Sequence, residues 1–235
     1  MKQRQSNAQV LNRVQGRTRK QIPDSGEGLR HRLRLAYFES TRALVAAVEA
    51  KDPHTRRHSL TVAYYATAIG RRIHLPARTI ESLWAAALLH DVGKIGVPDA
   101  ILTKPGPLND EEFTLVKRHP RTGLEILDHI SSLSDEKPMI LHHHERYDGT
   151  GYPDGLAGKK IPIGARILAV ADAVDAMLSP RSYKQPYSID RVRKELLIAS
   201  GRQFDPGVVQ VTLRWMDENP QALQRQQADK PVETV

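Results

Sequence analysis

Apolar side chains recur at the spacing of an α-helix along most of the chain, and no segment shows the clear alternation of a half-buried strand. This pattern predicts an all-α protein. Helices are expected at about residues 29–51, 55–74, 77–90, 110–118, 120–130, 136–145, 163–178, 189–199 and 206–219. Between them, residues 94–108 are rich in proline and glycine and predict a loop with at most one turn of helix.

The ends of the chain differ in composition from its middle. Residues 1–28 are polar and basic with few large apolar groups, which predicts a disordered segment. Residues 29–220 are expected to form one domain, with the helix at 29–51 resembling a linker or a dimerisation element. Residues 221–235 are expected to be a disordered tail.

The positive charge of the chain is concentrated near its start. Residues 1–36 hold nine basic and two acidic residues, which accounts for +7 of the formal net charge of +8. A basic segment can bind nucleic acid, but this one lacks the interleaved aromatic residues on which bases stack. We therefore favour a solvated leader over a nucleic-acid partner, and keep nucleic-acid binding through this segment as an alternative.

Composition also excludes several classes of protein. The chain has no cysteine, so disulfides and thiolate metal sites are excluded, and a metal ion would need histidine and carboxylate ligands. No apolar run approaches the ~18 residues of a membrane span, and the first residues lack the apolar core of a signal peptide. We therefore predict a cytoplasmic protein.

Histidine and aspartate are placed at the ends of the expected helices. The chain holds ten histidines. Taken singly, a histidine at a helix end is usually a cap or a surface residue. Together, these residues form the inventory of a site for two or more hard or borderline cations. The set consists of His54, His58, His90, Asp91, His119, His142, His143, His144, Asp172 and Asp175.

Neighbouring histidines have a specific use in such a site. Adjacent positions on a helix point ~100° apart, so we expect His143 and His144 to reach different ions. By the same reasoning, Asp91 beside His90 is free to bridge. Two ions about 3.5–4 Å apart suit phosphodiester hydrolysis, because they activate water and neutralise charge on the phosphate.

Several motifs resemble those of the HD-GYP family within the HD phosphohydrolase superfamily. His90–Lys94 resembles the HD doublet, and His143–Pro153 resembles the longer signature that gives the family its name. The similarity extends over roughly residues 40–210, through Lys104–Gly106, Ala171–Ala176, Arg181–Lys184 and Phe204–Pro206. The doublet alone is a weak signal, whereas the longer signature in the correct order is very specific.

This resemblance implies a helical HD bundle with additional C-terminal helices, and a cyclic di-GMP phosphodiesterase that forms linear pGpG and, in some members, GMP. It implies His90, Asp91 and Lys94 as catalytic residues, with Asp91 bridging the ions. The implied metal ligands are His58, His90, Asp91, His119, His143, His144 and Asp172. The implied substrate-binding residues are Lys94, Tyr152, Arg181 and Lys184.

Two positions depart from the family pattern. His54 stands where some members have a glutamate that helps to hold a third metal, so we expect two divalent ions, with iron or manganese favoured, and treat His54 as an optional third-metal ligand. Ser182 stands where proline is more usual, which loosens the segment that carries Arg181 and Lys184.

Other functions stay open at this point. The same metal site would serve another cyclic dinucleotide, such as cyclic GMP-AMP, because only the base contacts would differ. A degenerate member of the family would act as a binding or scaffold module, but all seven implied ligand positions are occupied here. Protein partners in second-messenger signalling and a homodimer are further expectations that the sequence does not decide.

Overall fold

The computed structural model describes residues 58–179 and 185–227, together with the isolated residues 26, 28, 29, 32, 45 and 46. The chain divides into two units, Met1–Ser40 and Thr41–Val235, and the description below concerns the second. Nearly all of the expected leader at 1–28 and of the expected helix at 29–51 lies outside the described residues. The division at 40/41 falls within that helix rather than at its start.

The described part of the second unit is helical, which confirms the predicted all-α class. Its only β-type pairings are two isolated bridges, and no described helix combines the length and apolar character needed to cross a membrane. The elements are α3 (His58–Arg72), α4 (Ala77–Leu89), η1 (Val92–Gly96), α5 (Asp99–Leu102), α6 (Asp110–Val116), α7 (His119–Leu127), η2 (Ser131–Leu133), α8 (Lys137–Leu141), η3 (Gly158–Lys160), α9 (Ile163–Leu178), α10 (Ile189–Ala199), α11 (Pro206–Glu218) and α12 (Pro220–Gln227).

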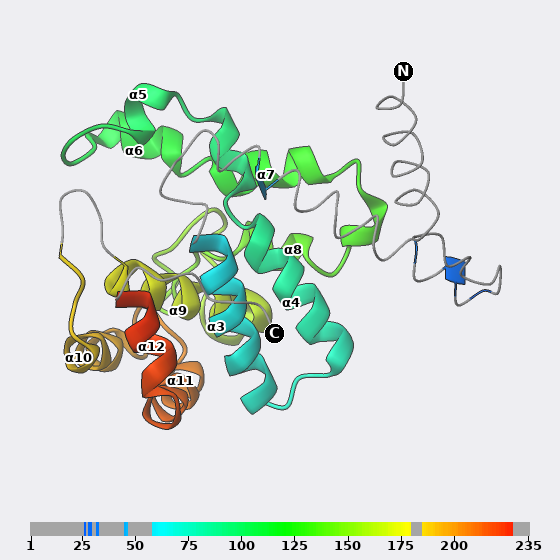
Figure 1. Ribbon diagram of the computed structural model, residues 1–235. Helices are drawn as coiled ribbons and strands as arrows, with labels where there is room; N and C mark the ends of the chain where they lie inside the picture. Colours follow the sequence, from blue (N-terminus) through cyan, green and yellow to red (C-terminus); the bar gives the residue numbers. More distant parts are fainter. Residues whose placement is uncertain are drawn as a thin grey trace, which may run out of the picture. The chain divides into compact units, whose positions relative to one another are not determined.

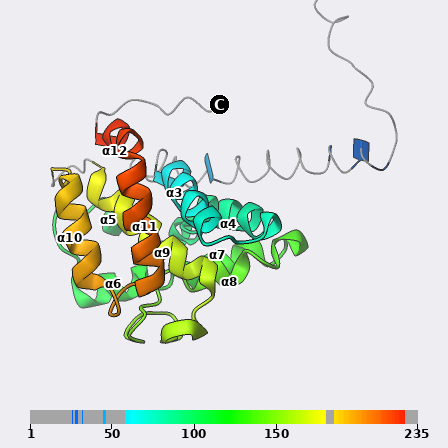
Figure 2. The same ribbon diagram turned by 90° about the horizontal axis from the view of Figure 1, so that it is seen from below.

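Helix α9 lies at the centre of the packing. It contacts α3 and α8 on one side and α10, α11 and α12 on the other, as Figures 1 and 2 show. Residues from most of its turns are buried, including Ile167, Ala171 and Leu178, each exposed by no more than 1%. A helix that is apolar nearly all round belongs in a core, so any carboxylate on it requires a partner.

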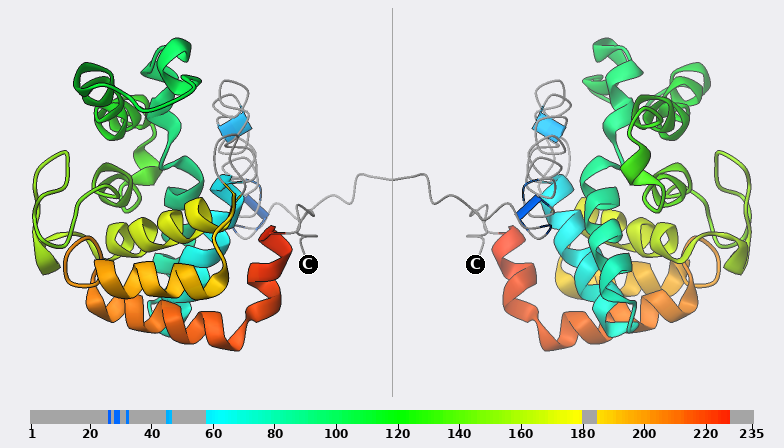
Figure 3. Two further views of the ribbon diagram at one scale, coloured as in Figure 1. Left: turned by 90° about the vertical axis from the view of Figure 1, so that its left-hand side faces the viewer. Right: turned by 90° about the vertical axis from the view of Figure 1, so that its right-hand side faces the viewer.

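The C-terminal helices α10, α11 and α12 cover the core on the side of α9 away from α8. Figure 3 shows α10 and α11 running beside α9, with α12 turning back at their end. Trp215 of α11 packs edge-on against Tyr65 of α3, with ring centroids 5.2 Å apart, and an ion pair joins Arg166 of α9 to Asp205, which caps α11. Both contacts join elements far apart in the sequence.

The expectation that the domain ends at residue 220 is wrong. Helix α12 continues to Gln227 and contacts α9 and α11. The physical reason is Leu223, whose side chain is fully buried and gives this otherwise polar segment an anchor in the core.

One expected helix and one expected loop also differ from the prediction. Helix α8 ends at Leu141 rather than near residue 145, so the three histidines that follow stand in a turn. The predicted loop at 94–108 contains the end of η1 and the four-residue helix α5, slightly more helix than expected. Helix α6 begins with a capping box, in which Asn109 and Glu112 satisfy each other's backbone amides.

Candidate metal centre

Five segments bring their histidines and aspartates to one place. His58 is the first residue of α3, His90 and Asp91 follow α4, and His119 begins α7. His143 and His144 follow α8, and Asp172 lies within α9. All seven residues that the resemblance implies as ligands are therefore among the described residues, and they form two adjacent groups.

The first group consists of Asp91, His119, His143 and His144, whose ligand atoms lie within 4.8 Å of one another. Nε2 of His119 lies 3.4 Å from Oδ1 of Asp91 and 3.4 Å from Nε2 of His143. Three of these four residues are buried. Convergence of nitrogen and oxygen ligand atoms in a buried place is what a cation site requires.

The second group consists of His58, His90 and Asp172. Nε2 of His58 lies 3.4 Å from Oδ1 of Asp172. Nε2 of His90 is buried and has no hydrogen-bond partner among the described residues. A buried polar atom without a partner is costly, and a cation at this position would satisfy it.

Asp91 stands between the two groups. Its Oδ1 faces His119 in the first group, whereas its Oδ2 lies 3.4 Å from Nε2 of His90 and 4.0 Å from Nε2 of His58. Lys94 also approaches Oδ2, at 2.6 Å. Burial alone would raise the pKa of Asp91, but Lys94 and the surrounding imidazoles hold that pKa well below its usual value. The carboxylate is therefore ionised and presents one oxygen to each group.

Backbone carbonyls orient three of the imidazoles. Nδ1 of His90, His119 and His143 each lies 2.6–2.7 Å from the carbonyl oxygen three residues earlier. Because a carbonyl only accepts, each Nδ1 carries the proton, and each Nε2 keeps its lone pair for the centre. Local helix-end geometry thus selects the tautomer that a metal ligand needs.

Burial keeps the imidazoles of the first group neutral. It lowers the pKa of His119, lowers that of His143 well below its usual value, and lowers that of His144 to about 4. Neighbouring imidazoles act in the same direction. A neutral imidazole is the form that binds a metal, so this group is ready for a cation at neutral pH.

The imidazole ring of His58 is oriented by a carboxylate, that of Asp175, and not by a backbone carbonyl. The sequence alone assigned no role to this residue. Nδ1 of His58 lies 2.6 Å from Oδ2 of Asp175, which is 2% exposed. Burial lowers the pKa of His58, but the hydrogen bond to Asp175 and the charge of Asp172 raise it above its ordinary value. The signal in the sequence was a second aspartate on an apolar helix, three residues after a candidate ligand.

The expectation that His143 and His144 reach different ions rests on a helix that the structure does not show at these residues. It assumed that both residues lie on a helix, but α8 ends at Leu141 and the backbone of His142 has already left helical geometry. In the turn that follows, the two rings lie with centroids 4.0 Å apart, and both join the Asp91 group.

The loop after these histidines is attached to the centre by Glu145 and Tyr152. The buried carboxylate of Glu145 accepts hydrogen bonds from the backbone amides of Asp154 (2.7 Å) and Leu156 (3.1 Å). The ring of Tyr152 stacks on that of His144, with centroids 5.0 Å apart and planes at 26°. Glu145, His142 and Asp154 form a third cluster of ligand-type groups, but Arg121 pairs with Asp154 and the amides occupy Glu145.

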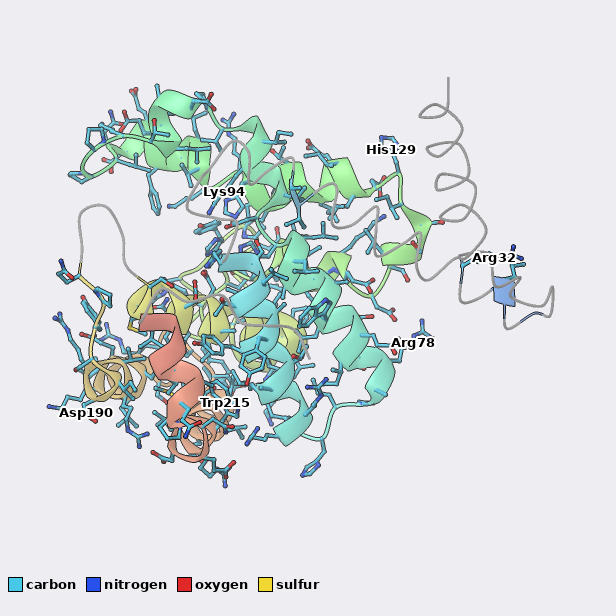
Figure 4. The ribbon with its side chains drawn as sticks, in the orientation of Figure 1. Arg32, Arg78, Lys94, His129, Asp190 and Trp215 are labelled. Atoms are coloured by element: carbon cyan, nitrogen blue, oxygen red, sulfur yellow. The ribbon has the colours of Figure 1, made fainter. Side chains whose placement is uncertain are left out.

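Three of the predicted residues cannot be placed. Arg181, Lys184 and the optional ligand His54 lie outside the described residues. Lys94 is described, and Figure 4 shows it between the α5–α6 segment and the end of α3 that carries His58.

The residues present fit a pair of cations. They supply neutral imidazoles with oriented lone pairs, ionised carboxylates, a buried nitrogen without a partner, and one carboxylate facing both groups. Oxygen and imidazole ligands without sulfur suit divalent ions such as iron and manganese better than soft ions.

Comparisons with known proteins found a matching family model and several similar proteins. The family model described as "HD domain" matches residues 42–208. The chain is 39% identical over 208 residues to a cyclic di-GMP phosphodiesterase of Vibrio cholerae, an alignment that covers 82% of this chain and 42% of that protein. It is 41% identical over 178 residues to a cyclic di-GMP phosphodiesterase response regulator of Xanthomonas campestris, covering 75% and 47% respectively. The chain thus spans less than half the length of these relatives.

A solved structure shares the fold. The crystal structure of a cyclic GMP-AMP specific phosphodiesterase of V. cholerae superposes with a TM-score of 0.62 at 20% identity, over 81% of this chain and 51% of that one. At this level of identity, the likeness concerns the helical architecture alone.

Proposed function

The chain belongs to the HD-GYP family of HD-domain proteins, and on that premise we propose that it is a metal-dependent phosphodiesterase that hydrolyses cyclic di-GMP to linear pGpG. The observation that carries this proposal is the position of Asp91. Its two oxygens face two separate histidine groups, which is the arrangement expected of a carboxylate that bridges two ions.

The ligands in this proposal are those that the sequence implied. His119, His143 and His144 would hold one ion, and His58, His90 and Asp172 the other, with Asp91 shared. Two such ions, when bound, lower the pKa of water and neutralise the charge of a phosphodiester. Iron or manganese fits the oxygen and imidazole set, and His54 keeps its place as an optional ligand of a third ion.

The residues around the ions have separate tasks. Asp175 fixes the ring of His58, and the backbone carbonyls fix those of His90, His119 and His143. Lys94 places an ammonium at the edge of the centre, beside Asp91, where a substrate phosphate would need a cationic donor. Arg181 and Lys184 keep the phosphate-binding role that the resemblance implies.

Several finer expectations accompany the proposal. Onward cleavage to GMP, a cytoplasmic location, a homodimer and protein partners in signalling are predictions from the sequence. The alternatives are another cyclic dinucleotide as substrate and a binding module without turnover. The names of the relatives favour hydrolysis of a cyclic dinucleotide.

The test is a turnover assay on protein purified without oxygen and loaded with manganese or ferrous iron. Products from cyclic di-GMP and cyclic GMP-AMP would be separated by chromatography, beside a His90→Ala/Asp91→Ala variant. We expect metal-dependent formation of pGpG, with a loss of more than about 100-fold in the variant, because it lacks the shared carboxylate. A fully metal-loaded wild type that turns over neither compound would overturn the proposal, and binding without turnover would identify a receptor.

A further inference from the structure

Lys117, just after the end of α6, lies between two aromatic rings at the rim of the metal centre. Its Nζ lies 4.5 Å from the centroid of Phe113, one helical turn earlier, and 5.7 Å from the centroid of Tyr152. Both distances are within the range of a cation–π contact. The three side chains therefore form one surface, which joins α6 to the loop that follows the histidines.

This surface is attached to the metal centre through Tyr152. The ring of Tyr152 stacks on His144, a member of the Asp91 group. Burial raises the pKa of Tyr152, and the charges of Asp91 and Asp172 raise it further, which agrees with a position close to the carboxylates of the centre. Lys117 thus stands one aromatic ring away from a candidate ligand.

The ammonium of Lys117 differs from the other lysines nearby in what it contacts. Lys94 pairs with Asp91, and Lys104 donates to both carboxylate oxygens of Glu112. Among the described residues, Lys117 has ring contacts and no carboxylate partner. Its charge is therefore available to an electron-rich group of a ligand.

Phe113 adds a flat apolar surface beside this charge. The residue is 43% exposed, which is a large exposure for an aromatic side chain. Its helix is held in place by the capping box of Asn109 and Glu112 and by the ion pair of Glu112 with Lys104. An exposed ring on a fixed helix, with an unneutralised ammonium above it, suits a planar ligand that stacks and accepts a hydrogen bond.

We propose that Phe113 and Lys117 form a guanine-binding site for the substrate, in which the base stacks on Phe113 and Lys117 donates to its O6 or N7 edge. Guanine presents two acceptors on that edge, whereas adenine presents one acceptor and an amino donor, which an ammonium opposes. Lys117 is therefore a specificity residue that favours a guanine-containing dinucleotide. This inference rests on the proposed function, because it identifies the bases of the same substrate.

The test compares substrates with and without bases. Lys117→Ala, Phe113→Ala and Lys117→Arg would be assayed as metal-loaded proteins with cyclic di-GMP, cyclic di-AMP and bis(p-nitrophenyl) phosphate. Lys194→Ala, an exposed lysine of α10, is the charge-matched control. We expect each alanine variant to raise KM for cyclic di-GMP about tenfold with little change in kcat, because stacking and an edge hydrogen bond are each worth about this factor.

Selectivity and the base-free ester give the decisive readouts. Hydrolysis of bis(p-nitrophenyl) phosphate should be unchanged, Lys117→Ala should reduce the preference for cyclic di-GMP over cyclic di-AMP, and Lys117→Arg should retain most of it. Equal losses on all three substrates would mean that Lys117 only packs α6 against the loop, and would overturn the inference. Unchanged KM for cyclic di-GMP in both alanine variants would overturn it as well.

A binding measurement tests the base site without requiring turnover. If the wild type does not hydrolyse cyclic di-GMP, the proposed function fails, and binding of 5′-GMP and 5′-AMP by equilibrium dialysis then decides the base site. The site is supported if the wild type binds GMP more tightly than AMP and Lys117→Ala abolishes that difference. It is overturned if the two nucleotides bind equally or if the variant keeps the difference.

Discussion

Nδ1 of His58 lies 2.6 Å from Oδ2 of Asp175, a carboxylate that is 2% exposed on the apolar helix α9. This contact turns the Nε2 atom of His58 toward Asp172, so Asp175 acts on the metal centre through the histidine. Carboxylate–histidine–metal arrangements fix ligand geometry and raise ligand basicity.

Asp175→Asn should weaken metal binding without removing any proposed ligand. We expect a loss of about 10- to 100-fold in the affinity of one of two ions, the usual effect of removing such a partner. Metal content after dialysis against a graded chelator, measured by mass spectrometry, checks this. Asp190→Asn, an exposed aspartate of α10, is the control. If both variants retain two ions equally, Asp175 has no role in the site.

Metal binding should release different numbers of protons from the Asp91 group and from the group that contains His58. The pKa of His144 is lowered to about 4, chiefly by burial, and those of His119 and His143 are lowered as well, so at pH 6.5 the neutral form of these rings predominates. Burial lowers the pKa of His58 too, but Asp175 and Asp172 raise it above the ordinary 6.5, so this ring is mostly protonated at pH 6.5. A metal must displace that proton, and therefore the affinity of this group rises as the pH rises through the raised pKa.

Calorimetry of manganese binding at pH 6.5, in two buffers of different ionisation enthalpy, measures the released protons. We expect release of up to about one proton at one site and close to none at the other. His58→Gln should abolish the release. Equal proton release at both sites would contradict the pKa difference between His58 and the Asp91 group.

Much of the fold was predictable because its helices carry strong local signals. The expected range 163–178 for α9 and the range 189–199 for α10 agree with the structure. The extent of the domain at its C-terminal end depends on burial, which the hydrophobic pattern did not predict. Helix α12 has a polar sequence, and it becomes part of the domain because Leu223 is buried against helices that are adjacent only in the folded chain.

The candidate site was predictable to the level of residue identity but not of geometry. The structure brings together the seven residues implied as ligands, yet the grouping of His143 with His144 depends on where α8 ends. Asp175 and Glu145 act through partners 117 and 9 to 11 residues away in the chain. Contacts between residues distant in the chain produce no periodic pattern in the sequence. The sequence therefore shows the residues but not which residues they contact.

Glu145→Gln should destabilise the loop that carries Tyr152. Both carboxylate oxygens accept backbone amides, and the side chain has no exposed surface. An amide offers only one acceptor and turns its NH₂ toward a buried N–H group, which costs about 1–3 kcal/mol of unfolding free energy. Urea unfolding of the metal-free protein measures it, with Glu125→Gln, exposed on α7, as the control. Equal stability of the two variants would show that the loop does not depend on Glu145.

Gly93→Ala should separate the two segments that carry Asp91 and His119. A Cβ atom on Gly93 would lie 1.8 Å from the carbonyl oxygen of His119 and 2.5 Å from the amide nitrogen of Gly123, both of them backbone atoms that cannot rotate away. The 3₁₀ helix η1 would have to move from α7, which lengthens the 3.4 Å separation of Asp91 Oδ1 from His119 Nε2.

We expect Gly93→Ala to lose about 1–3 kcal/mol of unfolding free energy, the usual cost of overpacking, and to bind the ion of the Asp91 group at least tenfold more weakly. Gly96→Ala is the matched control, because its nearest neighbour is a methyl group of Thr122 at 3.1 Å, which a side-chain rotation can relieve. Urea unfolding and metal content are measured for both. A Gly93→Ala protein as stable and as metal-rich as the Gly96→Ala protein would mean that contact between η1 and α7 does not set the geometry of the centre.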